Sequence, residues 1–185
     1  MEQVLRHFVS ALEAAGAPYM LTGSHASSLH SAPRMSYDID FVISPTRPEI
    51  LSLVQQLKDA GCYVDERAAL EALDTFGQFN AIDEETGLKA DFIIRKPRPF
   101  SETEFNRRRP AELYDVPLIV ATAEDVLIAK MEWAKLGESA RQIEDAAGIL
   151  KHRASSLDRT YIDQWVRQLG LEAQWEAVRR TSGVD

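Results

Sequence analysis

Apolar positions along the chain follow two periods, one typical of helices and one typical of buried strands. Apolar residues spaced three and four apart predict helices over residues 2–15 and 45–60, each followed by a glycine. Short apolar runs bounded by turn residues predict strands at residues 19–22, 38–43, 63–64, 76–82, 88–94 and 117–120. The turn at residues 83–87 makes the fourth and fifth strands an antiparallel hairpin. We therefore expect an α/β (α+β) chain with a mixed β-sheet flanked by helices.

The last third of the chain has only the helical period. It predicts helices over residues 123–136, 140–151, 159–169 and 172–180. The pattern changes near residue 121, so we expect a core of residues 1–121 and a helical part, residues 122–185, packed on that core. Trp133, Trp165 and Trp175 have apolar neighbours at helical spacing, which favours core packing over base stacking.

Two carboxylates interrupt the apolar run at residues 38–43. Residues two apart on a strand share a face, so Asp38 and Asp40 project to one side while Ile39 faces the other. Two anions this close require a cation, and oxygen ligands suit Mg²⁺. The pattern therefore predicts a metal site at Asp38 and Asp40.

A possible phosphate site precedes this run. Gly23 and Ser24 stand between the predicted strand at residues 19–22 and a helix that we expect to start at residues 26–29. Glycine lets the backbone approach a ligand closely, a helix N-terminus attracts phosphate oxygens, and the Ser24 hydroxyl adds a donor. We expect these two residues to bind a nucleotide's phosphates.

A hydrophobic-Gly-Ser segment followed by Asp-x-Asp at this spacing resembles the nucleotidyltransferase superfamily, which includes DNA polymerase beta, the CCA-adding enzymes and the AbiEii-type toxins. The resemblance implies a nucleotidyltransferase fold over residues 1–121 and a third metal-binding carboxylate on a neighbouring strand. Asp91 in the segment LKADFIIR matches it. The alternative is that Asp91 only marks a strand end or pairs with Lys89 or Arg95.

The same resemblance implies further nucleotide-binding residues. Lys130 after Glu124-Asp125 is similar to a motif of AbiEii-type proteins, although a lysine on an apolar stripe is also explained if its stem packs and its ammonium reaches water. Asp145 resembles the last motif of that group and lies at the edge of its helix's apolar face. Arg34 and Ser36 match the Arg-x-Ser/Thr pattern before Asp-x-Asp, with structural pairing as the equal alternative.

Composition limits the other functions. A net charge of −8 over 185 residues argues against a protein that coats nucleic acid. Any nucleic-acid contact must be local, and the basic segment at residues 95–109 is the candidate, with a solvated charged loop as the alternative. Cys62 is the only cysteine, so no internal disulfide is possible. No apolar run is long enough for a membrane span and the N-terminus lacks a signal-peptide layout, which predicts a cytoplasmic protein without membrane contact.

The resemblance implies transfer of a nucleoside monophosphate from a nucleoside triphosphate to an acceptor hydroxyl, with release of pyrophosphate. The implied cofactor is Mg²⁺ or Mn²⁺, held by Asp38, Asp40 and Asp91. The acceptor stays open between tRNA or other RNA, a protein and a small molecule, and a toxin–antitoxin role with a cognate antitoxin is one setting. The alternative is a catalytically silent relative that binds a nucleotide or a partner through the same fold.

Overall fold

The computed structural model describes residues 1–32, 35–137 and 139–184, which form two compact units. Unit 1 consists of Met1–Thr22 and Ser36–Val120, and unit 2 consists of Gly23–Met35 and Ala121–Asp185. Each unit is described by itself below. The predicted division into residues 1–121 and 122–185 stays a prediction.

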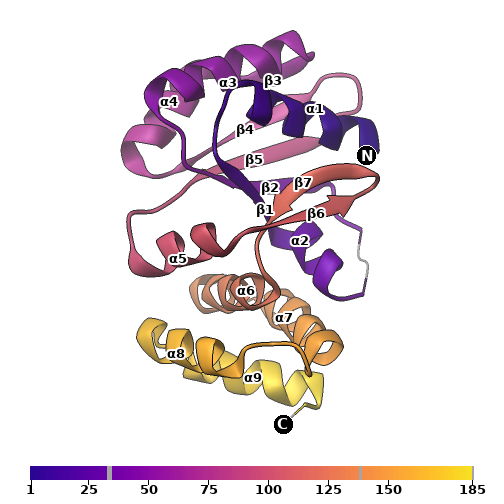
Figure 1. Ribbon diagram of the computed structural model, residues 1–185, viewed down its shortest axis with the longest axis vertical. Coiled ribbons are helices and arrows are strands. Elements are labelled where there is room, and N and C mark those ends of the chain that lie inside the picture. The colour runs from indigo at the N-terminus through magenta and orange to yellow at the C-terminus, as the bar shows by residue number, and fades with distance from the viewer. Residues whose placement is uncertain (33–34, 138, 185) are drawn as a thin grey trace. The chain divides into compact units, whose positions relative to one another are not determined.

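Unit 1 contains a seven-stranded sheet among the residues described, with the order β3-β4-β5-β2-β1-β7-β6 (Figure 1). The strands are β1 (Tyr19–Thr22), β2 (Asp38–Ile43), β3 (Cys62–Val64), β4 (Gln78–Asp83), β5 (Lys89–Ile94), β6 (Arg109–Leu113) and β7 (Val116–Val120). β2 pairs parallel with β5 and antiparallel with β1, while β4 and β5 form the predicted antiparallel hairpin. The predicted mixed sheet is confirmed.

The two faces of β2 have different chemistry because strand residues alternate. Ile39, Phe41 and Ile43 are fully buried, and the Phe41 ring stacks on Phe92 of β5 at 5.7 Å. Phe8 packs edge-on against Phe92 at 6.2 Å. This aromatic core covers one face of the sheet, so Asp38 and Asp40 project from the other face.

Four helices belong to the described part of unit 1: α1 (Glu2–Ala14), α3 (Arg47–Asp59), α4 (Glu66–Thr75) and α5 (Pro99–Arg107). α3 starts two residues later than predicted because Thr46 and Glu49 form a capping box at its N-terminus. The prediction missed α4, whose buried residues are only the small Ala69 and Ala72. Such small residues give a weak apolar period.

The basic segment at residues 95–109 is not the charged loop that the sequence left open. It contains α5, and it ends at the first residue of β6. Pro99 is at the start of α5, a position where proline is compatible with a helix, and Phe100 and Phe105 are buried. The two aromatic side chains therefore anchor a helix. The sequence did not indicate it, because the segment is rich in proline and arginine.

The described part of unit 2 is helical: α2 (Gly23–His30), α6 (Ala123–Gly137), α7 (Ala140–Arg153), α8 (Arg159–Leu169) and α9 (Glu172–Ser182). The four C-terminal helices lie where the sequence predicted them, within two residues at each end. Core packing is confirmed for Trp165, which is buried, but it is wrong for Trp133, whose side chain is 54% exposed. Trp175 is half-buried under the guanidinium of Arg159.

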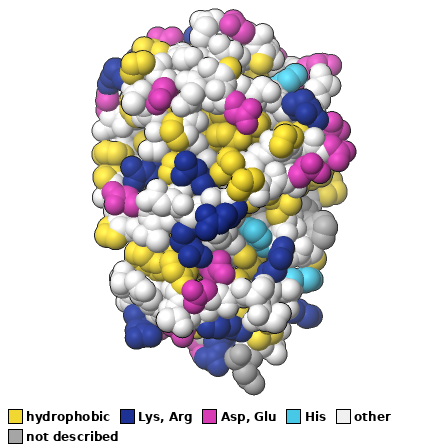
Figure 2. Space-filling model, viewed as in Figure 1, with side chains coloured by type: hydrophobic (Ala, Val, Ile, Leu, Met, Phe, Trp, Pro, Cys, Tyr) yellow, Lys and Arg dark blue, Asp and Glu magenta, His cyan; other side chains and the backbone are white. Residues whose placement is uncertain are grey.

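None of the helices in the described residues is both long and apolar enough to cross a membrane. On the face shown in Figure 2, lysine and arginine side chains form small groups interspersed with acidic and uncharged ones. This distribution agrees with the net charge of −8 and differs from the broad basic surface that nucleic-acid backbones require.

Candidate functional site

Three aspartates of unit 1 share one face of the sheet on two adjacent strands. Asp38 and Asp40 are two residues apart on β2, and Asp40 is paired in register with Asp91 of β5. On its other side, Asp40 is paired with Thr22, the last residue of β1. Partners in register point to the same side of a sheet, so the parallel pairing of β2 with β5 brings the third carboxylate to the first two. The expected neighbourhood of Asp91 is confirmed, while its role as a metal ligand stays a prediction.

Lys89 lies among these carboxylates. It is the β5 partner of Asp38, and its ammonium nitrogen is 3.0 Å from Asp91 Oδ2 and 3.5 Å from Asp38 Oδ1. The hydrogen bond to Asp91 is the main cause that raises the pKa of Lys89, and the negative charges of both aspartates add to it. The salt bridge that the sequence left as an alternative for Asp91 is therefore present, and it supplies the cation that neighbouring carboxylates need.

The donor set fits a divalent metal in its chemistry. Carboxylate oxygens are the ligands that Mg²⁺ prefers, and Asp38 is 57% exposed, so hydrated ions can reach it. Within the described residues, however, no three acidic, histidine or cysteine side chains already converge on one metal position. A metal ion held by Asp38, Asp40 and Asp91 would compete with the Lys89 ammonium for the carboxylate oxygens.

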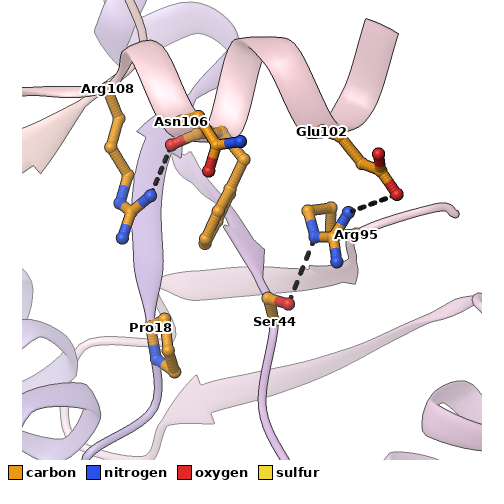
Figure 3. A pocket seen from close by; sticks show the side chains of 7 residues that line it. Pro18, Ser44, Arg95, Glu102, Asn106 and Arg108 are labelled. Atoms are coloured by element: carbon orange, nitrogen blue, oxygen red, sulfur yellow. Dashed lines mark hydrogen bonds and ion pairs between the residues drawn. The ribbon is translucent and has the colours of Figure 1, made fainter. Parts of the chain in front are cut away.

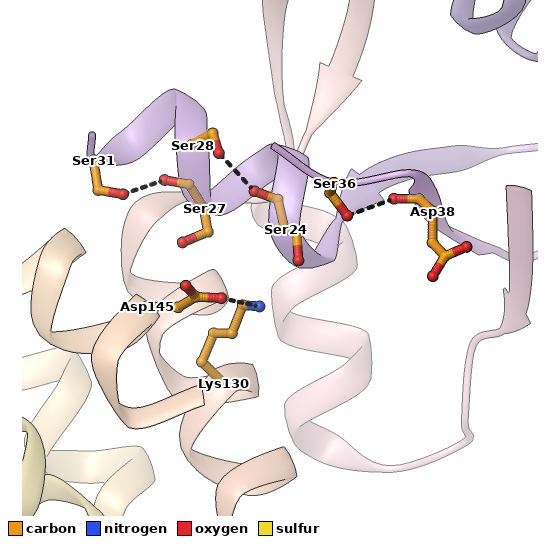
Figure 4. A network of polar contacts seen from close by, with 8 residues as sticks. All are labelled: Ser24, Ser27, Ser28, Ser31, Ser36, Asp38, Lys130 and Asp145. Atoms are coloured by element: carbon orange, nitrogen blue, oxygen red, sulfur yellow. Dashed lines mark hydrogen bonds and ion pairs between the residues drawn. The ribbon is translucent and has the colours of Figure 1, made fainter. Parts of the chain in front are cut away.

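The Gly-Ser segment forms the first turn of α2 instead of a turn ahead of it. Gly23 has φ +64°, a left-handed conformation that favours glycine, and this single residue turns the chain from β1 into the helix. Ser24 follows, and its carbonyl accepts a hydrogen bond from the Ser28 hydroxyl at 3.0 Å (Figure 4). Phosphate binding by Gly23 and Ser24 stays a prediction.

Two predicted nucleotide-binding residues precede β2. Arg34 lies outside the described residues. Ser36 belongs to unit 1, where its hydroxyl donates to the carbonyl of Asp38 at 3.2 Å (Figure 4). This bond fixes the entry of the chain into β2, which is the structural pairing that the sequence allowed, and a role in nucleotide binding stays a prediction.

Lys130 and Asp145 form a buried ion pair inside unit 2. The ammonium on α6 donates to Asp145 Oδ2 on α7 at 2.8 Å, and the two side chains are 5% and 10% exposed (Figure 4). The ammonium of Lys130 does not reach water, so the snorkelling alternative is wrong. A buried ion pair is costly to build and more costly to break, which identifies the contact between α6 and α7 as a fixed feature of this unit.

Unit 2 contains a second buried carboxylate, Asp125, whose burial the sequence did not predict. Asp125 is fully buried and accepts hydrogen bonds from Tyr161 Oη at 2.5 Å and from Thr122 Oγ1 at 2.6 Å. Glu124 accepts from the backbone N–H of Asp158 at 3.1 Å. The acidic residues ahead of Lys130 thus connect α6 to α8. Only the spacing of Thr122 and Asp125 at a helix start signalled part of this network.

No family model matches the chain, and no curated protein sequence does either. Solved structures do match. ANT(2'')-Ia, an antibiotic-resistance factor, aligns in its solution structure with a TM-score of 0.62 and 15% identity over 97% of this chain and 95% of that one. In its crystal structure with adenylyl-2''-tobramycin, the TM-score is 0.63 and the identity 14%, over 94% of this chain and 98% of that one.

A third similar structure is an antigenic nucleotidyltransferase-like protein from Paracoccidioides brasiliensis. It aligns with a TM-score of 0.60 and 14% identity over 96% of this chain and 91% of that one. Identities this low establish the fold alone. Each alignment covers almost all of this chain and of the matched chain. The chain therefore shares the fold of ANT(2'')-Ia and of this nucleotidyltransferase-like protein.

Proposed function

We propose that the protein is a nucleotidyltransferase that depends on Mg²⁺ or Mn²⁺ and moves a nucleoside monophosphate from a nucleoside triphosphate to an acceptor hydroxyl. The observation that carries this proposal is the register of β2 and β5, which pairs Asp40 with Asp91 and leaves Asp38 on the same face. Three carboxylates on one face of this fold suit divalent cations that bind a triphosphate.

The chemistry follows from these side chains. Bound divalent cations would supply the positive charge that offsets the phosphate oxygens and lowers the pKa of the acceptor hydroxyl. Asp38 and Asp40 would hold these cations and, through them, orient the triphosphate end. Asp91 would accept the proton of the hydroxyl as its oxygen bonds to the α-phosphorus. The bond from the α-phosphorus to the bridging oxygen breaks, and pyrophosphate leaves with the electron pair.

Other residues are proposed to bind the nucleotide's phosphates. For Gly23 and Ser24 the support is their place in the chain directly after Thr22, the β1 partner of Asp40. For Arg34 and Ser36 the support is their place in the sequence before Asp38. For Lys130 and Asp145 it is the resemblance of their segments to motifs of AbiEii-type proteins.

We propose a small molecule as the first acceptor class to test, ahead of tRNA and protein. ANT(2'')-Ia has been solved with adenylyl-2''-tobramycin, an adenylyl group joined to a small molecule. The net charge of −8 also disfavours an extended RNA acceptor.

The test is transfer of label from each of the four α-³²P nucleoside triphosphates, with Mg²⁺ or Mn²⁺, to aminoglycosides, total tRNA and the protein itself. We expect label on one acceptor class with wild type, and none with Asp38→Ala. The matched control is Asp74→Asn, which changes an exposed carboxylate of α4 that pairs with Arg47. Equal labelling by wild type and Asp38→Ala would contradict the proposal.

One observation favours a second candidate, a catalytically silent protein that binds a nucleotide or a partner. The ammonium of Lys89 already contacts Asp38 and Asp91, so these carboxylates have a cationic partner without metal. This candidate predicts nucleotide binding with no transfer to any acceptor and no dependence on divalent metal. Binding that requires Mg²⁺ and leads to pyrophosphate release would exclude it.

We propose that the protein acts in the cytoplasm, where nucleoside triphosphates are supplied. More specifically, we propose that it is the toxin of a toxin–antitoxin pair. A toxin that modifies a cellular acceptor would stop growth when it is expressed, and a cognate antitoxin would restore growth. We expect arrest with wild type and none with Asp40→Asn. Equal growth of both strains would exclude the toxin role without affecting the proposed chemistry.

A further inference from the structure

A pocket in unit 1 lies at the opposite end of β2 and β5 from the carboxylates. It has a volume of about 350 Å³ and is lined by Pro18, Ser44, Arg95, Glu102, Phe105, Asn106 and Arg108 (Figure 3). Ser44 and Arg95 directly follow β2 and β5, whereas Asp38 and Lys89 are the first residues of these parallel strands. At about 3.3 Å per residue, roughly 20 Å of strand separates Asp38 from Ser44.

The first cation of the pocket is held in position from two sides. Arg95 Nε donates to Ser44 Oγ at 3.2 Å, and its terminal nitrogen is 3.7 Å from Glu102 Oε1 on α5 (Figure 3). The Glu102 side chain is 57% exposed, so this pair is partly in water and weak. Arg95 is thus oriented toward the pocket by the serine, while its carboxylate partner can move away at low cost.

The second cation is stacked on an aromatic ring. The guanidinium carbon of Arg108 is 4.1 Å from the centre of the Phe105 ring, and that of Arg95 is 5.9 Å from the same centre. Arg108 also donates to the carbonyl of Phe105 at the C-terminal end of α5. Because Phe105 is buried, the ring is a firm support that holds both guanidinium groups at one site.

The charge of the pocket is incompletely balanced. Among the residues described, no carboxylate is paired with Arg108, and burial alone lowers the pKa of its guanidinium. Two arginines therefore face one exposed glutamate. An anion that entered the pocket would offset the desolvation of Arg108 and could replace Glu102 beside Arg95.

We propose that this pocket binds a small phosphate monoester. Guanidinium groups bind phosphate through paired N–H···O bonds, and three phosphate oxygens can meet two guanidinium groups at once. The Ser44 hydroxyl and the Asn106 amide are further donors in the lining. The volume is at the lower end of the range for small-molecule pockets, about 300–1,000 Å³, which suits a phosphate with a sugar-sized group.

The test is a titration of the full chain with ribose 5-phosphate, followed by the amide signals of residues around the pocket in ¹H–¹⁵N spectra. The buffer contains EDTA, because without divalent metal the three aspartates repel phosphate and only the pocket is observed. We expect saturable shifts at the amides of Ser44, Arg95 and Asn106 with a Kd near 1 mM or lower. Ribose, which lacks the phosphate, should cause no shifts at these amides.

Variants separate a specific site from general charge attraction. Arg108→Gln should weaken binding at least about tenfold, and Glu102→Gln should tighten it about two- to threefold by freeing Arg95. Asn106→Ala, at an exposed position, should weaken it severalfold without threatening the fold. The control Arg67→Gln removes an exposed arginine of α4 outside the pocket and should leave the Kd within about twofold.

Three results would overturn the proposal. The first is the absence of shifts at the pocket amides up to about 10 mM ribose 5-phosphate. The second is equal weakening by Arg67→Gln and Arg108→Gln, which would indicate unspecific charge. The third is tighter binding of a single-stranded RNA decamer at the same amides. Nucleotide transfer is not part of this measurement, so failure here would leave the proposed function intact.

Discussion

Each unit holds a lysine beside an aspartate, and the two arrangements differ in how much water surrounds them. Lys89 lies between Asp38 and Asp91, whose side chains are 57% and 16% exposed. Lys130 and Asp145 are 5% and 10% exposed. Exposed pairs contribute about 0–1 kcal/mol, whereas loss of one partner of a buried pair costs about 3–5 kcal/mol. The Lys89 ammonium can therefore be exchanged for another cation at little cost, and the Lys130 ammonium cannot.

The largest expected effect concerns the carboxylates around Lys89. Asp40→Asn keeps the side-chain shape but removes the charge opposite Asp91, so transfer should fall by at least about ten-thousandfold, or about 5 kcal/mol in the barrier. The free energy of unfolding should change by less than about 1 kcal/mol, because the site is partly solvated. Label transfer and urea denaturation measure the two quantities. Turnover within tenfold of wild type would exclude Asp40 from the chemistry.

Unit 2 should respond in the opposite way to loss of a charge. Lys130→Met leaves the buried Asp145 without the Lys130 ammonium, which should lower the free energy of unfolding by about 3–5 kcal/mol in urea denaturation. The matched control is Lys151→Met, at an exposed position of α7, which should change it by less than about 0.5 kcal/mol.

The double variant sharpens this result. Lys130→Met combined with Asp145→Leu removes both charges, so most of the lost stability should return. A double variant that is less stable than Lys130→Met would mean that Asp145 is retained for its other contacts and not as the counter-charge of Lys130.

A smaller effect on stability is expected for substitution of Lys89, whose ammonium can be exchanged for another cation. Lys89→Gln should change the free energy of unfolding by less than about 1 kcal/mol, since the ammonium is partly in water. It should increase the affinity for Mn²⁺ about three- to tenfold, because the metal no longer competes with a bound cation. Calorimetric titration measures the affinity. An affinity for Mn²⁺ that does not change would count against a metal between Asp38 and Asp91.

The helices and strands differ in how well the sequence predicted them. β1, β2 and α8 have the predicted bounds, because turn-forming residues border each of them. α4 and α5 were missed for different reasons: α4 buries only alanines, and α5 lies in a segment dominated by proline and arginine. β6 is an edge strand with exposed residues, so no alternation marks it.

Only those features of the candidate site that depend on residues close in sequence could be predicted. The shared face of Asp38 and Asp40 follows from strand alternation, and the hairpin predicted that Asp91 is nearby. The pairing of Asp40 with Asp91 depends on the contact of β2 with β5, which are distant in sequence, and no local pattern sets that register. The same holds for the Lys130–Asp145 pair, where the sequence marked both residues but not their contact.

The smallest expected effect is the pH dependence of the Lys89 contacts. The hydrogen bond to Asp91 raises the pKa of Lys89 above its ordinary value of 10.5, so the protonated amine stabilises the folded chain below that pH. This contribution is lost as the pH rises through the higher pKa of the folded state. Lys89 is 33% exposed, and solvent screening reduces the contribution to a few tenths of a kcal/mol.

Urea midpoints between about pH 8 and pH 11.5 should therefore fall slightly more for wild type than for Lys89→Gln. Parallel curves would mean that the ammonium is too well solvated to sense the carboxylates, and the exchange with metal would then cost even less than proposed.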